Sequence, residues 1–289
     1  MREQKQNWHC LQFAVPQVQS EDIAACCFEL GSCGLQVEDE GETARLTAYF
    51  AAEYDSEHIR AKIEERLLAL GLVETDVESE ALEDQDWEEE WRRFFKPVWA
   101  TPRIVVHASW IPVEVAAGQF AIVIDPKMAF GTGGHESTQL CLEALEKISR
   151  ADSRCLDLGT GSGILSIAAV KMGAMRVLAL DIDAQAVENA RENLLRNGVD
   201  PEKVDLRQGG IEAGAGQLFD LVLANIQSHV LRPLLPQIDG LLGGGGQVIF
   251  SGLLAREEVA FCKWVRDAGL EVDEVLCKNN WIAVVARRV

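Results

Sequence analysis

Long apolar stretches are missing from this chain of 289 residues, although 48% of its residues are hydrophobic. A helix needs a run of about 18 or more apolar residues to cross a bilayer, and the chain has no such run. Its first residues, MREQKQNWHC, also lack the apolar core of a signal peptide. We therefore expect a cytoplasmic protein without a membrane span.

Cysteine pairs with the spacing of a metal site are absent as well. The eight cysteines include no C-x-x-C pair, and Cys26 and Cys27 are adjacent within an apolar stretch. Zinc sites and redox-active thiols usually show that spacing. We expect buried, reduced thiols and no bound metal.

Basic residues are scarce. Lys and Arg number 27 against 46 Asp and Glu, so the net charge is −19. Residues 1–96 hold 9 basic and 23 acidic residues and contribute −14 of that charge. A negative field repels nucleic-acid phosphates and attracts basic partners. The asymmetry favours a basic protein partner over direct nucleic-acid binding, although acidity also serves simply to keep a protein in solution.

The most informative stretch is RCLDLGTGSGILSIAAVKMGAMRVLALDID, residues 154–183. A short apolar strand runs into the glycine-rich turn 159–163, a helix is predicted over 164–172, and a second strand ends in Asp181. Glycines let the backbone approach a ligand closely, and a helix start offers free N–H groups to a negative group. An acid that ends the next strand is well placed to bind ribose hydroxyls.

The glycine spacing separates two classes of nucleotide cofactor. The dinucleotide pattern G-x-G-x-x-G fails in both registers, because its third glycine would fall on Ile164 or Ser166. The segment 157–163 instead reads D-x-G-x-G-x-G, which resembles motif I of the S-adenosylmethionine-dependent methyltransferases. That resemblance implies that Asp157 lies near the amino-acid end of the cofactor and that Asp181 binds its ribose.

The length allows one large domain and a small one. In the N-terminal part, predicted strands and helices alternate in the β-α-β-β-α-β order of a ferredoxin-like fold. They are predicted at residues 8–15, 20–30 (with Ser20 as N-cap), 34–37, 44–50, 55–70 and 73–82. We expect a ferredoxin-like substrate-recognition domain over residues 1–82.

A highly charged segment, EDQDWEEEWRRFF, follows the small domain. Its four aromatic residues fall at helical spacing, which predicts a linker helix over residues 83–96 that packs an aromatic stripe. Pro97 and Pro102 then mark a boundary. We expect the catalytic domain to comprise residues 97–289.

The catalytic part alternates strands and helices, and the helix predicted over residues 229–242 is interrupted by prolines. This part ends in a hairpin, in the seven-strand order of the class I methyltransferases. This α/β fold places ligands at the carboxyl ends of its strands. One predicted strand, 219–224, ends at Asn225. The following Ile226 and Gln227 offer no Asn-Pro-Pro-aromatic motif, which counts against methylation of a flipped base.

A second glycine-rich stretch, DPKMAFGTGGHEST at residues 125–138, is typical of a ligand loop that precedes a helix. We expect that helix over residues 139–148, capped by Ser137 or Thr138. A lone histidine in such a loop, here His135, is more often a hydrogen-bonding group that orients the loop than a catalytic base.

These stretches together resemble the ribosomal protein L11 methyltransferase family over nearly the whole chain. The resemblance implies a protein N-methyltransferase that modifies lysine side chains, with the N-terminal α-amine as a further acceptor. The N-terminal domain would bind a basic ribosomal protein, and the linker would let a monomeric enzyme swing between target amines. The family pattern implies that S-adenosylmethionine contacts Thr138, Gly159, Asp181 and Asn225.

Four departures from the family pattern flank the acceptor side. Gly134 replaces a threonine, Glu136-Ser137 replaces Pro-Thr, and residues 227–230 read Gln-Ser-His-Val instead of Leu-Ala-Gly-Pro; Lys127 also stands where glycine is usual. The sequence therefore leaves another basic protein or a small molecule as alternative acceptors. A non-catalytic binding module is disfavoured, because the motif residues are intact.

No residue is predicted to be an essential base. A lysine amine has a pKa of about 10.4, so about one in a few thousand is neutral at pH 7. A dry pocket and a nearby sulfonium both disfavour the ammonium form. His135 and Asn225 are candidates for orienting the amine.

Overall fold

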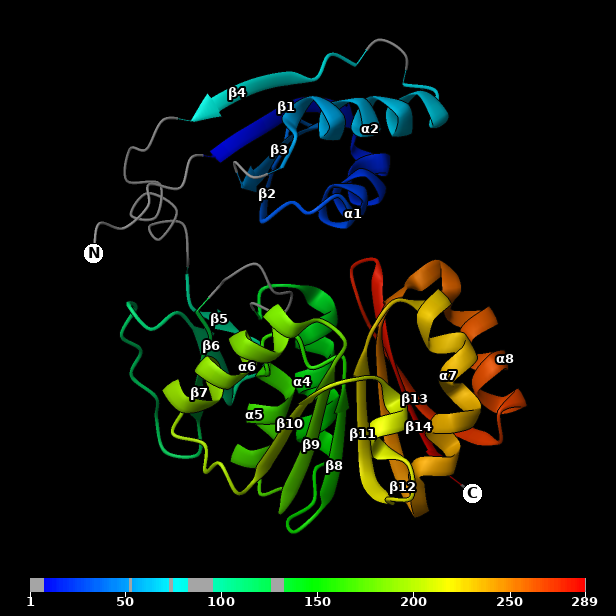
Figure 1. The fold of residues 1–289 in the computed structure, drawn as a ribbon. Helices are drawn as coiled ribbons and strands as arrows, with labels where there is room; N and C mark the ends of the chain where they lie inside the picture. Colours follow the sequence, from blue (N-terminus) through cyan, green and yellow to red (C-terminus); the bar gives the residue numbers. More distant parts are fainter. Residues whose placement is uncertain (1–7, 52–53, 73–74, 83–95, 126–132, 289) are drawn as a thin grey trace. The chain divides into compact units, whose positions relative to one another are not determined.

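The computed structural model describes residues 8–51, 54–72, 75–82, 96–125 and 133–288. The chain divides into two compact units, Met1–Phe94 and Phe95–Val289 (Figure 1). Within the described segments, no helix is both long and apolar enough to cross a membrane. The aromatic residues of the predicted linker helix lie outside the described residues.

The N-terminal unit contains an antiparallel sheet of strand order β2-β3-β1-β4 with two helices against it (Figure 1). β1 is central and pairs with both β3 and β4. Leu11, Phe13 and Val15 of β1 are buried against helix residues such as Ile23 and Ile63. This is the predicted ferredoxin-like order. Its elements are β1 (Trp8–Pro16), α1 (Ser20–Glu29), β2 (Gly34–Asp39), β3 (Thr43–Ala51), α2 (Ser56–Ala69) and β4 (Glu78–Leu82).

The predicted N-cap of the first helix is wrong. A 3-10 turn, η1 (Gln17–Gln19), precedes α1, and Ser20 is already helical. The Ser20 hydroxyl donates to the carbonyl of Gln17 at 2.8 Å instead of accepting from the helix. At α2 the cap is Asp55, whose carboxylate accepts from the backbone N–H groups of Glu57 and His58, as short polar side chains do at helix starts.

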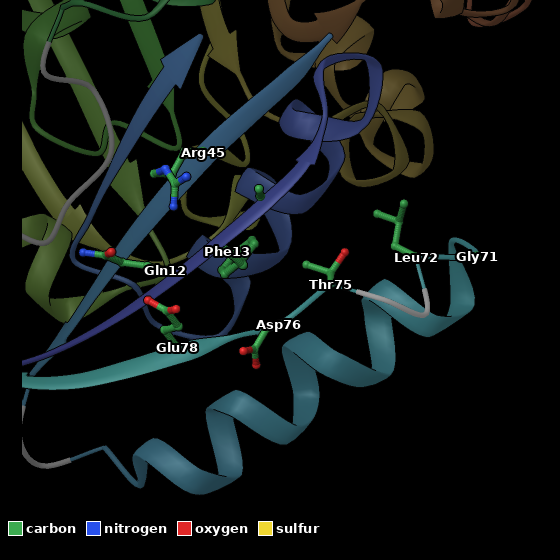
Figure 2. A pocket seen from close by; sticks show the side chains of 9 residues that line it. Gln12, Phe13, Arg45, Gly71, Leu72, Thr75, Asp76 and Glu78 are labelled. Atoms are coloured by element: carbon green, nitrogen blue, oxygen red, sulfur yellow. The ribbon is translucent and has the colours of Figure 1, made fainter. Parts of the chain in front are cut away.

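A groove of about 640 Å³ lies on the N-terminal unit. Figure 2 shows its lining: Gln12 comes from β1, Arg45 from β3, and Glu78 from the start of β4. Thr75 and Asp76, which precede β4, line it as well. The sheet ladder between β1 and β4 covers only Trp8–Gln12 of β1, so the groove opens where that ladder stops.

The second unit is built on a seven-stranded sheet of order β10-β9-β8-β11-β12-β14-β13 (Figure 1). Neighbouring strands from β10 to β12 run parallel, and β14 is antiparallel to both of its neighbours. The strand order reverses at β8. The strands are β8 (Arg154–Leu158), β9 (Arg176–Asp181), β10 (Val204–Gln208), β11 (Phe219–Asn225), β12 (Leu242–Leu254), β13 (Leu270–Lys278) and β14 (Trp281–Arg288).

Helices cover both faces of this sheet (Figure 1). Alternate strand residues point to opposite faces: Val177 joins the core cluster that contains α4, α5 and α6, whereas Leu178 joins the cluster with α7 and α8. The helices are α4 (Glu136–Ile148), α5 (Ile164–Lys171), α6 (Ala184–Arg196), α7 (Ser228–Leu241) and α8 (Glu258–Asp267), with 3-10 turns η2 (Ile211–Gly214) and η3 (Ala255–Glu257).

The predicted interruption of α7 by prolines does not occur. Pro233 and Pro236 lie within a continuous helix, on its exposed side. Leu231, Leu235 and Ile238 form the opposite, buried face and anchor the helix to the sheet. Tertiary burial therefore outweighs the local cost of proline.

A small sheet of order β5-β6-β7 completes the second unit. Ile104, Val106 and Ile122 from this sheet belong to the same core cluster as α4 and α5. The small sheet is therefore fixed to one helix layer, and it leads directly into the predicted ligand loop. Its strands are β5 (Val98–Trp99), β6 (Ile104–His107) and β7 (Phe120–Val123).

Candidate active site

The carboxyl ends of three parallel strands meet at one edge of the large sheet. Leu158 of β8 lies opposite Leu180 of β9 and opposite Ala224 of β11. The next residue of each chain segment is Gly159, Asp181 or Asn225. The three predicted cofactor residues from these strands are thus brought level with one another, beside the point where the strand order reverses. Ligands of open α/β sheets bind at such a point.

The glycine-rich turn is held against the end of β9. The backbone N–H groups of Gly159 and Thr160 donate to the carbonyl of Leu180 at 2.8 and 2.9 Å. One oxygen of the Asp181 carboxylate accepts from the N–H of Gly161 at 2.9 Å, and the other accepts from Asp183 at 3.0 Å. Asp181 therefore organises the turn as well as ending the strand.

Glycine is required at Gly159 for two reasons. Its φ is +71°, in the left-handed region that side chains disfavour. A Cβ there would also lie 2.9 Å from Cδ1 of Ile226. The tight approach leaves the turn and the end of β11 in direct contact.

Asp157 is buried beneath the turn, with 1% of its surface exposed. One of its oxygens accepts from the hydroxyls of Thr160 and Ser166 at 2.7 and 2.6 Å. Its other oxygen, Oδ1, has no hydrogen-bond partner among the described residues. Burial raises the pKa of Asp157, and the two hydroxyl donors oppose that rise.

Thr138 and Asn225 meet at this edge although 87 positions separate them in the chain. The Asn225 side-chain amide donates to the Thr138 hydroxyl at 3.3 Å. Thr138 is fully buried, and Oδ1 of Asn225 is buried without a partner in the described part of the chain. All four predicted cofactor residues thus come together.

The predicted cap of the next helix is wrong, because α4 begins at Glu136. Ser137 and Thr138 are in its first turn, and His135 is the N-cap. Nδ1 of His135 accepts from the N–H of Ser137 at 3.2 Å, which is the role that a serine or threonine oxygen usually takes. The His135 ring packs edge-on against Trp281, with ring centroids 4.4 Å apart.

His135 is unsuited to act as a general base. Burial lowers the pKa of His135, which makes its ring a weaker proton acceptor than an ordinary histidine. Its Nδ1 is engaged by the helix start and by the Ser137 hydroxyl at 2.8 Å. The geometry therefore supports the expectation that this histidine orients a loop.

Two of the departures from the family pattern have partners within the chain. Glu136 accepts from the side-chain amide of Asn279 at 3.0 Å. The Ser228 hydroxyl donates to the carboxylate of Glu257, which also accepts from the N–H of Leu254. These polar side chains therefore tie α4 and α7 to neighbouring segments. Lys127 lies outside the described residues.

Sequence reasoning missed one residue at this edge. Ile182 follows Asp181 directly, and 78% of its surface is exposed. A large apolar side chain so exposed beside a predicted ribose acid is a candidate to cover an apolar part of a ligand. Its position after the strand-ending acid was visible in the sequence, but its exposure was not.

The seven-stranded sheet and the site at its carboxyl edge define a class I methyltransferase. A family model described as ribosomal protein L11 methyltransferase (PrmA) matches residues 7–289. The chain belongs to that family. Its match includes both units.

Relatives with this name resemble the chain over most of its length. One from Caldicellulosiruptor saccharolyticus is 36% identical over 294 residues, covering 93% of this chain and 96% of the relative. One from Dictyoglomus thermophilum is 33% identical, covering 92% of this chain and 94% of the relative. A crystal structure of ribosomal protein L11 methylase from Lactobacillus delbrueckii subsp. bulgaricus is 32% identical, with a TM-score of 0.62 over 67% of this chain and 99% of that chain.

S-adenosylmethionine is the methyl donor of this class, and the residues at the strand ends fit it. The two partnerless buried oxygens, on Asp157 and Asn225, face no donor in the described parts of the chain, and S-adenosylmethionine carries ammonium and hydroxyl donors. A side chain at Gly159 would collide with Ile226, so the glycine keeps the turn close to the end of β11, where these residues lie. When bound, the cofactor supplies a methyl group on a positively charged sulfur.

Proposed function

We propose that this protein methylates amino groups of ribosomal protein L11, on lysine side chains and on the N-terminal α-amine. The observation that carries the proposal is the family match over residues 7–289, which extends through the N-terminal unit as well as the methyltransferase fold. The relatives that share this length are named for that substrate. Ribosomal proteins act in the cytoplasm, and we place the enzyme there.

Four residues would contact the cofactor. Asp181 would accept hydrogen bonds from the ribose hydroxyls, and Gly159 would let the backbone lie close to the ligand. Thr138 and Asn225, already joined by a hydrogen bond, would face the methionine end of the molecule. We add Ile182 as a fifth residue, whose exposed side chain would cover the adenine ring.

The acceptor must reach the site as a neutral amine. Deprotonating a lysine of pKa about 10.4 at pH 7 costs about 4–5 kcal/mol. A site that excludes water and holds a nearby positive charge disfavours the ammonium form and lowers that cost. In-line positioning of the amine then supplies much of the rate. Asn225 is the candidate for orienting the amine, because its Oδ1 has no partner within the described residues.

The groove of the N-terminal unit would bind the basic protein substrate. Asp76 and Glu78 line it beside Arg45, which is paired with Glu40, and the first 96 residues carry a net charge of −14. Such a surface attracts Lys- and Arg-rich segments and repels RNA. The substrate is therefore proposed to be the protein alone, bound by a monomeric enzyme.

Reversing one groove charge should weaken substrate binding without changing cofactor binding. For Glu78→Lys we expect the KM for L11 to rise about three- to tenfold at low salt, with the effect shrinking as salt screens the charge. The matched control is Glu42→Lys, which makes the same charge change on an exposed residue outside the groove. Equal KM values for the two variants would remove the groove from the proposal.

The function itself is tested by the intact mass of unmodified L11 after incubation with this enzyme and S-adenosylmethionine. We expect mass gains in methyl steps, and peptide mapping should place them on amines. If L11 gains no mass while the enzyme binds the cofactor by calorimetry, the substrate assignment is wrong. A screen of other basic proteins and of small-molecule amines would then identify the acceptor.

A further inference from the structure

Helix α6 carries Asn189 and Asn193, and Asn197 is its C-cap residue, so three asparagines are spaced four residues apart. This spacing places them on one face of the helix. Asn193 is fully buried, and Asn189 is 4% exposed. Burying a carboxamide costs free energy unless it is hydrogen-bonded, so each of these side chains calls for a partner.

Asn193 connects two segments that are far apart in the chain. Its Nδ2 donates to the carbonyl of Ser162 in the glycine-rich turn at 3.0 Å. Its Oδ1 accepts from the N–H of Asp125 at 3.3 Å, at the first residue of the second glycine-rich stretch. One side chain thus bridges the glycine-rich turn and the first residue of the second glycine-rich stretch, the two stretches that the sequence marks as ligand-binding.

The glycine-rich turn is fixed at three consecutive residues. Asp181 accepts from the N–H of Gly161, and Asn193 donates to the carbonyl of Ser162. Gly163 packs so closely on α6 that a Cβ there would lie 3.2 Å from Cβ of Ala190. Two of these three contacts come from α6, so this helix sets the orientation of the turn.

Asp125, whose N–H donates to Asn193, is itself held by several contacts. Its carboxylate accepts from the N–H and hydroxyl of Ser109 at 2.7 and 2.9 Å. It also pairs with Nε of Arg196 on α6 at 2.9 Å, and both side chains are largely shielded from solvent. Because these contacts fix Asp125, its N–H holds the Asn193 side chain in place, and Asn193 in turn holds the Ser162 carbonyl.

We propose that Asn193 is a positioning residue for S-adenosylmethionine binding, which holds the peptide at Ser162 in the orientation that the cofactor needs. The inference rests on the proposed contact between the cofactor and the glycine-rich turn. Asn193 does not touch the reacting atoms; it acts through the Ser162 carbonyl and the Asp125 amide.

Asn197, the C-cap residue of α6, lies four residues after Asn193 and provides a matched comparison. Its Nδ2 donates to the carbonyls of Val123 and Asn193 at 2.7 and 2.8 Å, and its Oδ1 accepts from the N–H of Val123 at 2.9 Å. It therefore anchors strand β7 and makes no hydrogen bond to the turn. The two asparagines have the same chemistry, but only Asn193 reaches the turn.

The test compares Asn193→Asp with Asn197→Asp. Each change keeps the shape and an acceptor oxygen but replaces the amide donor by oxygen, so in Asn193→Asp a carboxylate faces the Ser162 carbonyl. We expect the Kd for S-adenosylmethionine, measured by calorimetry, to rise at least tenfold in Asn193→Asp and to stay within about twofold in Asn197→Asp. The Tm should fall in both variants.

A pH series separates positioning from a general loss of structure. Protonation of the new aspartic acid restores a donor, so the Kd of Asn193→Asp relative to the unmodified enzyme should recover between pH 7 and pH 5. Asn193→Ala removes the bridge without adding charge and should show the same affinity loss with no recovery. Equal affinity losses in Asn193→Asp and Asn197→Asp, or an unchanged Kd in Asn193→Ala, would overturn the proposal. Because the readout is cofactor binding, it is independent of whether L11 is the acceptor.

Discussion

The Asp181→Ala variant is expected to bind S-adenosylmethionine at least 100-fold more weakly than the unmodified enzyme. Hydrogen bonds to a charged group contribute about 1.5–3 kcal/mol each, and the carboxylate would accept two from the ribose. The variant also loses the bond from Gly161, which organises the glycine-rich turn. A loss of about 3–4 kcal/mol of binding free energy corresponds to a 100- to 1,000-fold rise in Kd. Calorimetry measures it directly.

Two variants separate the ribose contact from the support of the turn. Asp181→Asn keeps an acceptor for Gly161 but loses the charge, so we expect a smaller loss, about tenfold. Asp183→Ala removes an acid two residues away, whose carboxylate caps α6 by accepting from Gln185 at 2.8 Å. It should cost about 1 kcal/mol of stability with little change in Kd. Comparable affinity losses in Asp183→Ala and Asp181→Ala would contradict a specific role for Asp181.

The Gly252→Ala variant is expected to be the most destabilised of the single glycine variants in the large sheet. Gly252 has a φ of +77°, and a Cβ there would lie 2.8 Å from the backbone C and O atoms of Ile226. The left-handed conformation alone costs about 1–2 kcal/mol for a residue with a side chain. Backbone atoms cannot move aside as a flexible side chain can, so we expect a total loss of about 3 kcal/mol or more.

The Gly252→Ala substitution should also disturb the active site. Ile226 follows Asn225 and contacts the space above Gly159, so a displaced Ile226 disturbs both predicted cofactor contacts. We expect weaker cofactor binding as well as a lower free energy of unfolding in urea. The control is Gly245→Ala in the same strand, with a φ of +73° but no atom within 4 Å of its Cβ. Gly245→Ala should lose only the free energy of unfolding that the left-handed backbone conformation costs. Equal losses of unfolding free energy in the two variants would refute the steric argument.

Local patterns in the sequence predicted most of the elements and the position of three candidate site residues at strand ends, while the contact of these residues with the cofactor stays a prediction. Gly159, Asp181 and Asn225 each follow or end an apolar strand, and parallel strands bring such ends to one edge. These strands are buried on both faces, as their continuous apolar composition indicates, and successive residues join opposite core clusters. These predictions succeeded because they depend on spacing along one strand or one turn.

Two of the errors arose where contacts with distant parts of the chain decided the local structure. His135 caps α4 in place of the predicted Ser137 or Thr138, because its ring also packs against Trp281 of the distant hairpin. The prolines of α7 do not break the helix, since its opposite face is buried against the sheet. Propensity rules favour serine caps and proline breaks, and tertiary contacts outweighed both.

By itself, the sequence determined the alternation of strands and helices, the glycine-rich turn and the acid that ends the next strand, because each of these follows from periodicity and composition over a few residues. The methyltransferase fold was implied by the resemblance of residues 157–163 to a family motif. Only the tertiary structure decided that Thr138 meets Asn225, that an oxygen of Asp157 and one of Asn225 lack partners in the described chain, and that Asn193 joins Ser162 to Asp125. These contacts join residues 31 to 87 positions apart. Their geometry depends on how whole strands and helices pack, which no local pattern encodes.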